Sequence, residues 1–374
     1  MIKCYTYNGG LIRFVGVVED YTSFTFERSY SGIGEWQIVI SGYSQNAQYL
    51  RLADFIQAGK GVCGLITKRT ETRDGDNWEI TFNGIELKGL TQKRIVMPPT
   101  NEAYLTYKKQ PPEYVIANLL SSQVTETEDK RKIVGSIAAY EAGTEQITYE
   151  GRFSSLSEDI VELAETYQIG WYADIEDLNI VWHIYKGIDR RASQSANNRF
   201  IVSYNYDNMS GSTLEQSRYN TNTALVAGQG EGVERKTEIV NDTNTGLNRT
   251  EVYIDARDIE DDTLLAQRGV EKLAEYGDTD IFEAVPAQGY FADNYRLTYD
   301  LGDVGTLLEE NIDFRLTSIT EVYENNAFSL NFVFGYDAST LTAALKRLTT
   351  NVTSSAAFEV SSSTGAILYG GTWD

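Results

Sequence analysis

The feature that most constrains the fold is a series of short strand-like runs in the first hundred residues. The runs are rich in β-branched and aromatic side chains, and Gly, Asn or Asp separates them; they cover 11–18, 23–26, 36–40, 62–70 and 78–83. Between the last two, the segment Asp74–Asn77 has the residues of a tight hairpin turn, because Gly75 tolerates positive φ. Pro98 and Pro99 end the unit, since neither can donate to a sheet ladder. The pattern predicts a small β-barrel-like domain in residues 1–97.

Residues 98–195 combine helical and strand patterns. One helix is expected to begin after Pro112, and a second covers 155–168, where apolar residues recur at helical spacing. Ser155 and Glu158 form a capping-box pattern at its start. Two strand patterns joined by a short turn follow, at 171–175 and 179–185. The segment is therefore expected to be a helix-on-sheet α+β domain.

Residues 196–337 return to strands and enclose one helix near 261–276. Acidic residues precede this helix and Gly277 follows it, as the helix dipole and capping rules favour. A hairpin formed by 314–323 and 328–334 closes the segment, and 338–374 follow as a short helix and an extended tail. The chain is expected to be mainly β, with two small β-barrel-like domains around an α+β insert.

Length and charge narrow the function classes. A chain of 374 residues fits two or three domains. The net charge of −22, from 54 acidic and 32 basic residues, argues against a protein that binds nucleic acid regardless of sequence. An acidic wall suits a conduit through which DNA slides, and acidity also keeps a protein soluble.

The chain has no obvious targeting segment and few cysteines. Cys4 and Cys63 alone give neither a disulfide framework nor a cysteine metal site of the usual count, so folding in a reducing cytosol is expected. No apolar run is long enough to cross a membrane, and the N-terminus lacks a signal-peptide pattern.

Residues with chemical potential are present without a convincing pattern. Gly59–Gly64 matches the letters of a dinucleotide-binding loop, but strand follows it where a helix is required, so a β-turn is expected. The single histidine, His183, lies in an alternating strand. The clusters Glu158–Asp159 and Asp258–Asp262 contain the carboxylates that glycoside hydrolysis needs, although helix starts also favour acids. We expect no catalytic, cofactor or metal site.

A further signal is the order of several short segments along residues 1–337. None is specific alone; they are 21–28, 34–38, 64–66, 84–90, 93–95, 187–190, 227–230, 249–251 and 301–304. In this order the chain resembles the hub proteins at the tail tip of siphophages, the type found at the N-terminus of tail-associated lysins. Those hubs are related to the baseplate hubs of contractile phages and to the upper domains of type VI secretion spikes.

The resemblance implies a structural protein. Three copies, each with two barrel-like domains, would form a ring of six barrels that joins a sixfold tail tube to a threefold spike or fibre. The implied partners are two further copies of the chain, the distal tail protein or tube proteins, and a fibre, tip or receptor-binding protein. DNA would pass through the channel without specific binding during genome ejection and host cell entry. The protein would belong to the virion tail tip and be assembled in the cytoplasm of the bacterial host.

The resemblance ends before the C-terminal segment, since many relatives continue there into peptidase, lysin or receptor-fibre domains. Residues 338–374 are too few for an independent catalytic domain. Their apolar tip is a candidate partner interface that could close the channel, bind a fibre or wall-degrading protein, or pair with a neighbouring subunit; it contains Ile367, Leu368, Tyr369 and Trp373.

Two other functions remain open from the sequence. One is a tail-associated hydrolase of bacterial wall polymers that uses acidic residues of the middle domain. The other is a glycan-binding receptor module that uses exposed Tyr and Trp side chains, since aromatic residues make up 12% of the chain.

Overall fold

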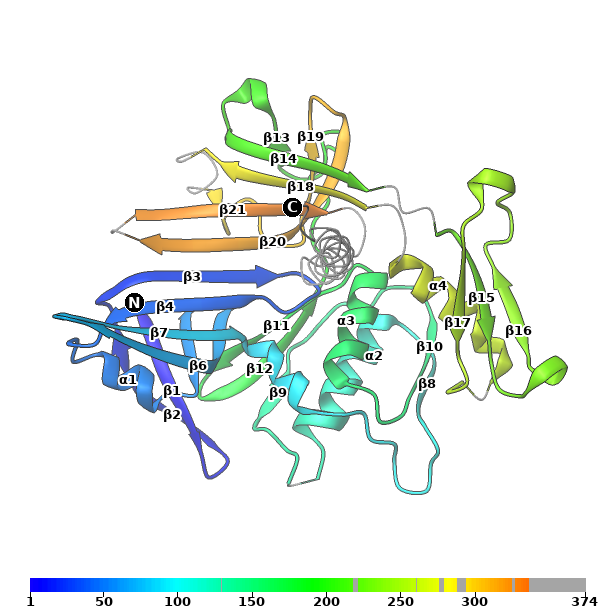
Figure 1. Cartoon of the computed structure of the whole chain (residues 1–374), viewed down its shortest axis with the longest axis horizontal. Helices are drawn as coiled ribbons and strands as arrows, with labels where there is room; N and C mark the ends of the chain where they lie inside the picture. The colour runs from blue at the N-terminus through cyan, green and yellow to red at the C-terminus, as the bar shows by residue number, and fades with distance from the viewer. Residues whose placement is uncertain are drawn as a thin grey trace, which may run out of the picture.

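The N-terminal part of the computed structural model consists of strands and one short helix (Figure 1). The structure describes residues 1–128, 130–217, 221–259, 261–275, 279–287, 294–324 and 327–335. The N-terminal elements are β1 (Ile2–Asn8), β2 (Leu11–Val18), β3 (Tyr21–Ser29), β4 (Glu35–Ser41), α1 (Ala47–Leu52), β5 (Phe55–Gly59), β6 (Val62–Asp74) and β7 (Asn77–Glu86). The predicted hairpin turn is confirmed, because Asp74 pairs with Asn77 and Gly75 has φ of +57°.

The C-terminal part of the described chain contributes a second group of strands. They are β13 (Ile201–Val202), β14 (Met209–Ser217), β18 (Thr279–Pro286), β19 (Val304–Leu307), β20 (Ile312–Glu324) and β21 (Ala327–Gly335). The predicted closing hairpin is confirmed as β20 and β21, which pair up to Glu324 and Ala327.

The two groups of strands share one sheet. β3 pairs antiparallel with β20, from Ser29 opposite Ser318 to Ser23 opposite Glu324. The resulting order is β14-β18-β21-β20-β3-β4-β7-β6-β5-β1-β2, with β13 and β19 attached beside β20. The expected mainly β fold is confirmed, but no closed barrel forms among the described strands, and the two groups of strands join edge to edge. We call the β3–β20 pairing the seam.

The middle of the chain is a helix-on-sheet unit, as predicted. Its elements are β8 (Leu105–Gln110), α2 (Pro112–Leu120), β9 (Gly135–Ile137), β10 (Ile147–Gly151), α3 (Leu156–Thr166), β11 (Gly170–Glu176) and β12 (Asn179–Tyr185). The helices and the sheet pack around Trp171 and Trp182, whose stacked rings are fully buried with centroids 6.2 Å apart. The predicted capping box is wrong: Ser155 occupies the N-cap, but its hydroxyl contacts the hydroxyl of Ser157 and caps no backbone N–H.

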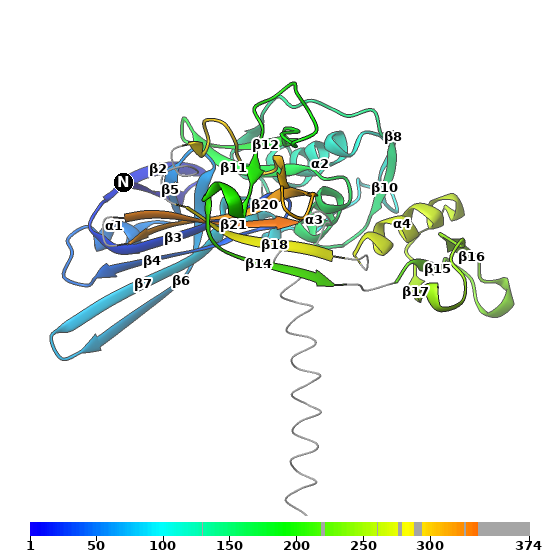
Figure 2. The same cartoon turned by 90° about the horizontal axis from the view of Figure 1, so that it is seen from above.

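A small α+β unit projects from the side of the molecule in both views (Figures 1 and 2). It contains β15 (Thr223–Ala227), β16 (Thr237–Val240), β17 (Glu251–Asp255) and α4 (Leu265–Glu275), inserted between β14 and β18. The three strands have the order β16-β15-β17, and one face of this sheet packs on α4. We call it the appendage. The sequence predicted its helix but not its separate sheet.

Candidate functional site

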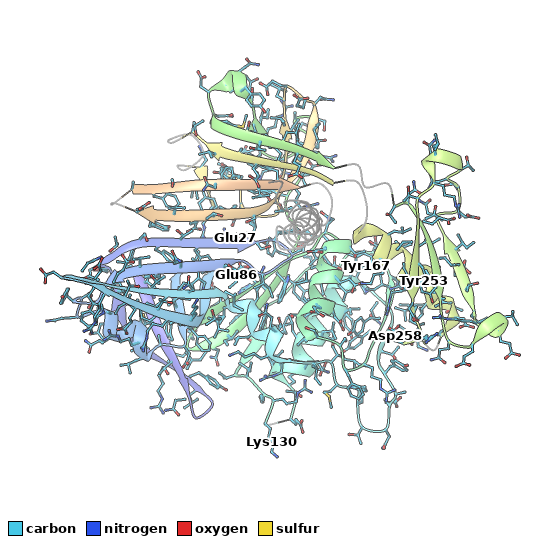
Figure 3. All side chains as sticks on the ribbon, in the orientation of Figure 1. Glu27, Glu86, Lys130, Tyr167, Tyr253 and Asp258 are labelled. Atoms are coloured by element: carbon cyan, nitrogen blue, oxygen red, sulfur yellow. The ribbon has the colours of Figure 1, made fainter. Side chains whose placement is uncertain are left out.

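The seam is the place where the N-terminal and C-terminal strands are held together, and side chains reinforce its backbone pairing. Figure 3 shows Glu27 and Glu86 near this line. The Ser318 hydroxyl on β20 donates to Glu27 on β3 at 2.9 Å. Burial raises the pKa of Glu27, although this hydrogen bond opposes the shift. Ser318 and Glu27, which are nearly 300 positions apart, are therefore joined by a hydrogen bond that is largely shielded from water.

Arg28 links the seam to the segment that precedes β19. Its Nη1 donates to the hydroxyl of Tyr295 at 2.6 Å and to Asp300 Oδ1 at 2.7 Å. Tyr295 in turn donates to Glu321 on β20, and Arg296 binds the same carboxylate at 2.7 Å. Burial disfavours the charge on Arg28, but Tyr295 and Asp300 raise its pKa well above the usual range. The guanidinium therefore stays charged and ties the two parts of the chain together.

Lys88 makes a second buried connection, between the N-terminal strands and the middle unit. Its side chain is 0% exposed, and Nζ donates to the carbonyl oxygens of Ser29 and Trp171 at 2.5 and 3.0 Å. Glu86 lies 3.1 Å from the ammonium and also accepts from the backbone N–H of Gly34. Burial lowers the pKa of Lys88, while Glu86 opposes that shift. A buried charge of this kind is tolerated because the ammonium donates to two backbone carbonyls and is paired with a carboxylate.

We call the region around Arg28, Lys88 and Glu321 the junction. Two of the short segments singled out in the sequence meet there. In the segment 301–304, Asp303 accepts from the N–H of Ile188 at 2.7 Å and from Arg190 Nε at 2.6 Å. Gly187 packs so closely on Gly302 that a Cβ at position 187 would overlap the Gly302 carbonyl. The segments 187–190 and 301–304 therefore interlock. Close backbone approach explains Gly187, whereas Gly302 has φ of +92° and a Cβ there would overlap the Tyr30 ring.

Three other predicted segments meet around Trp36 on β4. Its indole N–H donates to the carbonyl of Ile85 at 3.0 Å, and its ring covers Gly84 on the adjacent strand β7 and Gly64 on β6, the next strand beyond it. A Cβ at either glycine would overlap the indole. The glycines of segments 64–66 and 84–90 thus make room for the tryptophan of segment 34–38.

The acidic clusters proposed for hydrolysis meet at one cavity between α3 and α4. This α3–α4 cavity has a volume of about 200 Å³, and Asp159 and Asp258 both line it. Asp159 Oδ2 accepts from the hydroxyls of Tyr149 at 2.5 Å and Ser154 at 2.6 Å. Burial raises the pKa of Asp159, although these hydrogen bonds oppose the shift.

Two further acids of the α3–α4 cavity form ion pairs. Asp258 lies 2.8 Å from Arg268, and Glu162 lies 3.0 Å from Lys272 on α4. The Gln267 amide exchanges two hydrogen bonds with the backbone of Thr148 on β10. The Glu162–Lys272 and Gln267–Thr148 contacts therefore fasten the appendage to the middle unit, whereas glycoside hydrolysis needs one protonated acid facing an ionised carboxylate across a substrate.

The other candidate residues lie in structural positions. His183 is on β12, where its ring stacks on Tyr172 and Nε2 lies 3.0 Å from Glu176. Cys4 and Cys63 are buried and unpaired. Within the described ranges, no group of three or more His, Cys, Asp or Glu residues is arranged to hold a metal ion. None of the helices in those ranges has the length and apolar character to span a membrane.

The candidate interface at Ile367, Leu368, Tyr369 and Trp373 lies outside the described residues. Sequence reasoning missed the charged residues Arg28, Lys88 and Glu321, because in a sequence charged side chains look like solvent-facing ones. The glycine segments beside them were the available signal.

The comparisons with known proteins agree with this fold. The model of the family described as "Siphovirus ReqiPepy6 Gp37-like protein" matches residues 5–336, which is most of the chain. No curated protein matches the chain.

Solved structures of three prophage or tail proteins have a similar fold. The prophage tail protein gp18 from Listeria monocytogenes is 8% identical with a TM-score of 0.53, over 93% of this chain and 98% of that one. The tail protein from Neisseria meningitidis is 13% identical with a TM-score of 0.52, over 90% and 97%. The 43 kDa tail protein of prophage MuSo2 from Shewanella oneidensis is 13% identical with a TM-score of 0.50, over 89% and 97%.

Proposed function

The chain belongs to the Siphovirus ReqiPepy6 Gp37-like family of phage tail proteins, and we propose that three copies of it form a ring at the tip of a tail. The carrying observation is the composition of the large sheet. On one side of the seam lie β20, β21, β18 and β14, with β19 and β13 attached beside β20, and on the other lie β3, β4, β7, β6, β5, β1 and β2. Each chain thus supplies two sheet halves, and three chains would supply six.

Two halves in each of three chains support a role in joining a sixfold part of the tail to a threefold part. Six halves, each curled with its neighbouring strands into a barrel-like unit, would match a sixfold tail tube or distal tail protein above. The threefold arrangement of whole chains would match a tip, fibre or receptor-binding protein below. Such a ring would belong to the virion, be assembled in the host cytoplasm, and act mechanically rather than as an enzyme.

The outer edges of the two halves support closure of the ring. From Thr67 to Asp74, β6 pairs with β7 alone among the described strands, and β14 pairs with β18 alone. Figure 2 shows the β6–β7 hairpin extending beyond the rest of the N-terminal strands. A head-to-tail ring would place the β6 edge of one chain beside the β14 edge of the next, and strand edges with unpaired N–H and C=O groups favour such contacts.

A rigid joint between the halves supports transmission of force along the ring. Arg28 and Lys88 hold the seam and the middle unit in one arrangement. The chains of such a ring would move against each other as rigid bodies. Binding of a host receptor at the tail tip would favour one packing of the chains over another. The channel would then let DNA pass during ejection, and the net charge of −22 would keep the wall from binding it.

Cross-linking tests this arrangement. Thr70→Cys on β6 combined with Ser212→Cys on β14 should give covalent dimers and trimers with a short bismaleimide, since both positions are exposed. Each single variant is the control and can yield dimers only between equivalent sites. The natural Cys4 and Cys63 are buried and should not react. A double variant that forms trimers by mass yet never cross-links would reject this edge contact but not the trimer.

A further inference from the structure

A large cavity with a basic rim lies apart from the residues of the seam. It has a volume of about 640 Å³ and lies between the N-terminal strands and the segment 130–134 of the middle unit. Four cations line it: Lys93, Arg94, Lys130 and Lys132. Figure 3 shows Lys130 at the border of the molecule, directed away from the ribbon. In a chain with a net charge of −22, such a concentration of positive charge is unusual. We call it the basic cavity.

The cations of the basic cavity are not neutralised within the described chain. None of the four, nor the adjacent Arg131, forms an ion pair with a described carboxylate, whereas most arginines near the seam and the appendage do. Asp54 is the one acid among the lining residues, and its carboxylate accepts from Thr6 and the N–H of Tyr7. Like charges gathered without partners repel each other, so an anionic occupant would relieve a cost present in the isolated chain.

Arg94 shows the effect of this crowding. Burial and the nearby Arg131 lower the pKa of Arg94. Its three guanidinium nitrogens donate to backbone carbonyls, two bonds to Arg131 and one to Lys93. The guanidinium fork is therefore engaged and poorly placed to bind a phosphate through two parallel bonds. The lysines, which carry compact charges on flexible stems, remain exposed for carboxylates at varied positions.

The floor of the basic cavity is apolar. Phe55, Leu65, Leu90 and Ile133 are buried beneath it, and Tyr7 is partly buried at its side. Basic rim and apolar floor together favour a ligand with several carboxylates and one apolar side chain over a bare phosphate chain. We propose that the basic cavity binds an acidic polypeptide segment of a partner protein, anchored by an aromatic or aliphatic side chain. Only the placement of that partner in a tail rests on the proposed function.

Fluorescence anisotropy with designed peptides tests the site on the full chain. The probe is a short labelled peptide in which glutamates flank one tryptophan. We expect saturable binding that weakens about tenfold in the double variant Lys93→Glu with Lys132→Glu, and falls steeply with added salt. The control, Lys108→Glu with Lys236→Glu, makes the same charge change at exposed lysines that do not line the cavity, and binding should change less than about twofold. Circular dichroism confirms that both variants are folded.

Two competitors test the ligand class. Replacing the glutamates by glutamines should abolish binding, and replacing the tryptophan by serine should weaken it. Single-stranded DNA of equal charge should compete poorly. The proposal is wrong if no acidic peptide binds, if the control variant loses as much affinity as the cavity variant, or if DNA displaces the peptide at equal concentration. None of these results depends on whether the chain forms a trimer, so they leave the proposed ring to its own tests.

Discussion

The junction at the seam is held by buried charged side chains, whereas the appendage is held by a small apolar cluster. At the seam, charged side chains are buried among fixed partners, as Lys88 is between Ser29, Trp171 and Glu86. In the appendage, the buried cluster of the described residues consists of six small or aliphatic side chains, and large apolar side chains are left exposed. Buried ion pairs add little net stability but strongly penalise any other arrangement of their partners. The difference suggests that the seam specifies one rigid geometry, whereas the appendage is a docked unit with a free surface.

The exposed face of the appendage sheet has a continuous apolar row. Leu225 on β15 lies opposite Ile239 on β16 and Tyr253 on β17, and all three are at least 38% exposed. α4 covers the other face through Val226 and Val240, and Gly269 lets the helix approach these valines closely. The appendage sheet is thus packed through one face only, and its other face leaves an apolar row exposed.

The largest effect is expected at Lys88. Lys88→Met leaves Glu86 charged and buried without its cation, so the free energy of unfolding should fall by about 3–5 kcal/mol. Urea denaturation followed by tryptophan fluorescence measures it. Adding Glu86→Gln should recover part of the loss, because the amide oxygen can still accept from the N–H of Gly34. If Lys88→Met alone is as stable as the parent chain, the seam does not depend on the Lys88–Glu86 pair.

The second test compares two glycines of the large sheet. Gly84→Ala places a Cβ against Trp36 and the carbonyl of Leu65, and it should cost about 1–3 kcal/mol by overpacking. The control is Gly211→Ala on the edge strand β14, where nothing lies within 4 Å of the added Cβ, and the change should stay within about 0.5 kcal/mol. Thermal unfolding distinguishes the two. Equal losses would contradict the tight packing inferred around Trp36.

The attachment of the appendage should break without affecting the seam. Gln267→Ala removes both hydrogen bonds to Thr148, which are worth about 1 kcal/mol each. Hydrogen exchange should speed up in α4 and β15 while β3 and β20 keep their protection. Gln92→Ala, at an exposed position away from the appendage, is the control. Faster exchange across the seam in Gln267→Ala would mean that the two regions unfold together.

A pH effect is expected where the appendage meets the middle unit. Because the folded state raises the pKa of Asp159 above its ordinary value of 3.8, the folded chain binds more protons than the unfolded chain just above that pH. Stability therefore falls as pH rises through the interval between the two pKa values. Asp159→Asn should flatten this part of the curve of melting temperature against pH. The same slope in the variant would assign the effect to another group.

The smallest effect is expected on the apolar row. Ile239→Ser changes a side chain that is 47% exposed, so the free energy of unfolding should change by no more than about 0.5 kcal/mol. Val226→Ser, on the covered face of the same sheet, is the matched contrast and should cost more, because it puts a hydroxyl against α4. Equal costs would show that the exposed face also packs inside the chain.

Local structure could be predicted from the sequence, because hairpins and helices depend on neighbouring residues. The turn at Asp74–Asn77, the β20–β21 hairpin and α3 follow from turn residues and apolar spacing. The seam could not be predicted this way, since it joins strands almost 300 residues apart and each alone has the pattern of an ordinary half-buried strand. Two barrel-like domains were expected because pattern alone does not show which strand edge meets which.

The junction was also partly visible in the sequence. The segments 187–190 and 301–304 were singled out in the sequence, but the sequence did not show that Gly187 and Gly302 lie against each other. Arg28 and Asp300 are 272 positions apart, so no spacing rule links them. The acidic clusters at 158–159 and 258–262 were recognised separately, and only the fold brings Asp159 and Asp258 to one cavity. Contacts between distant segments are set by tertiary packing, which short motifs do not encode.

The most direct test of the central claim is the mass of the purified full chain in solution, measured by light scattering coupled to size exclusion over a range of concentrations. The account predicts a particle of three chains, and electron micrographs of that particle should show a ring with an open centre. A strict monomer at every concentration, which stays monomeric when the distal tail protein is added, would contradict the proposal that the two sheet halves serve to build a trimeric ring.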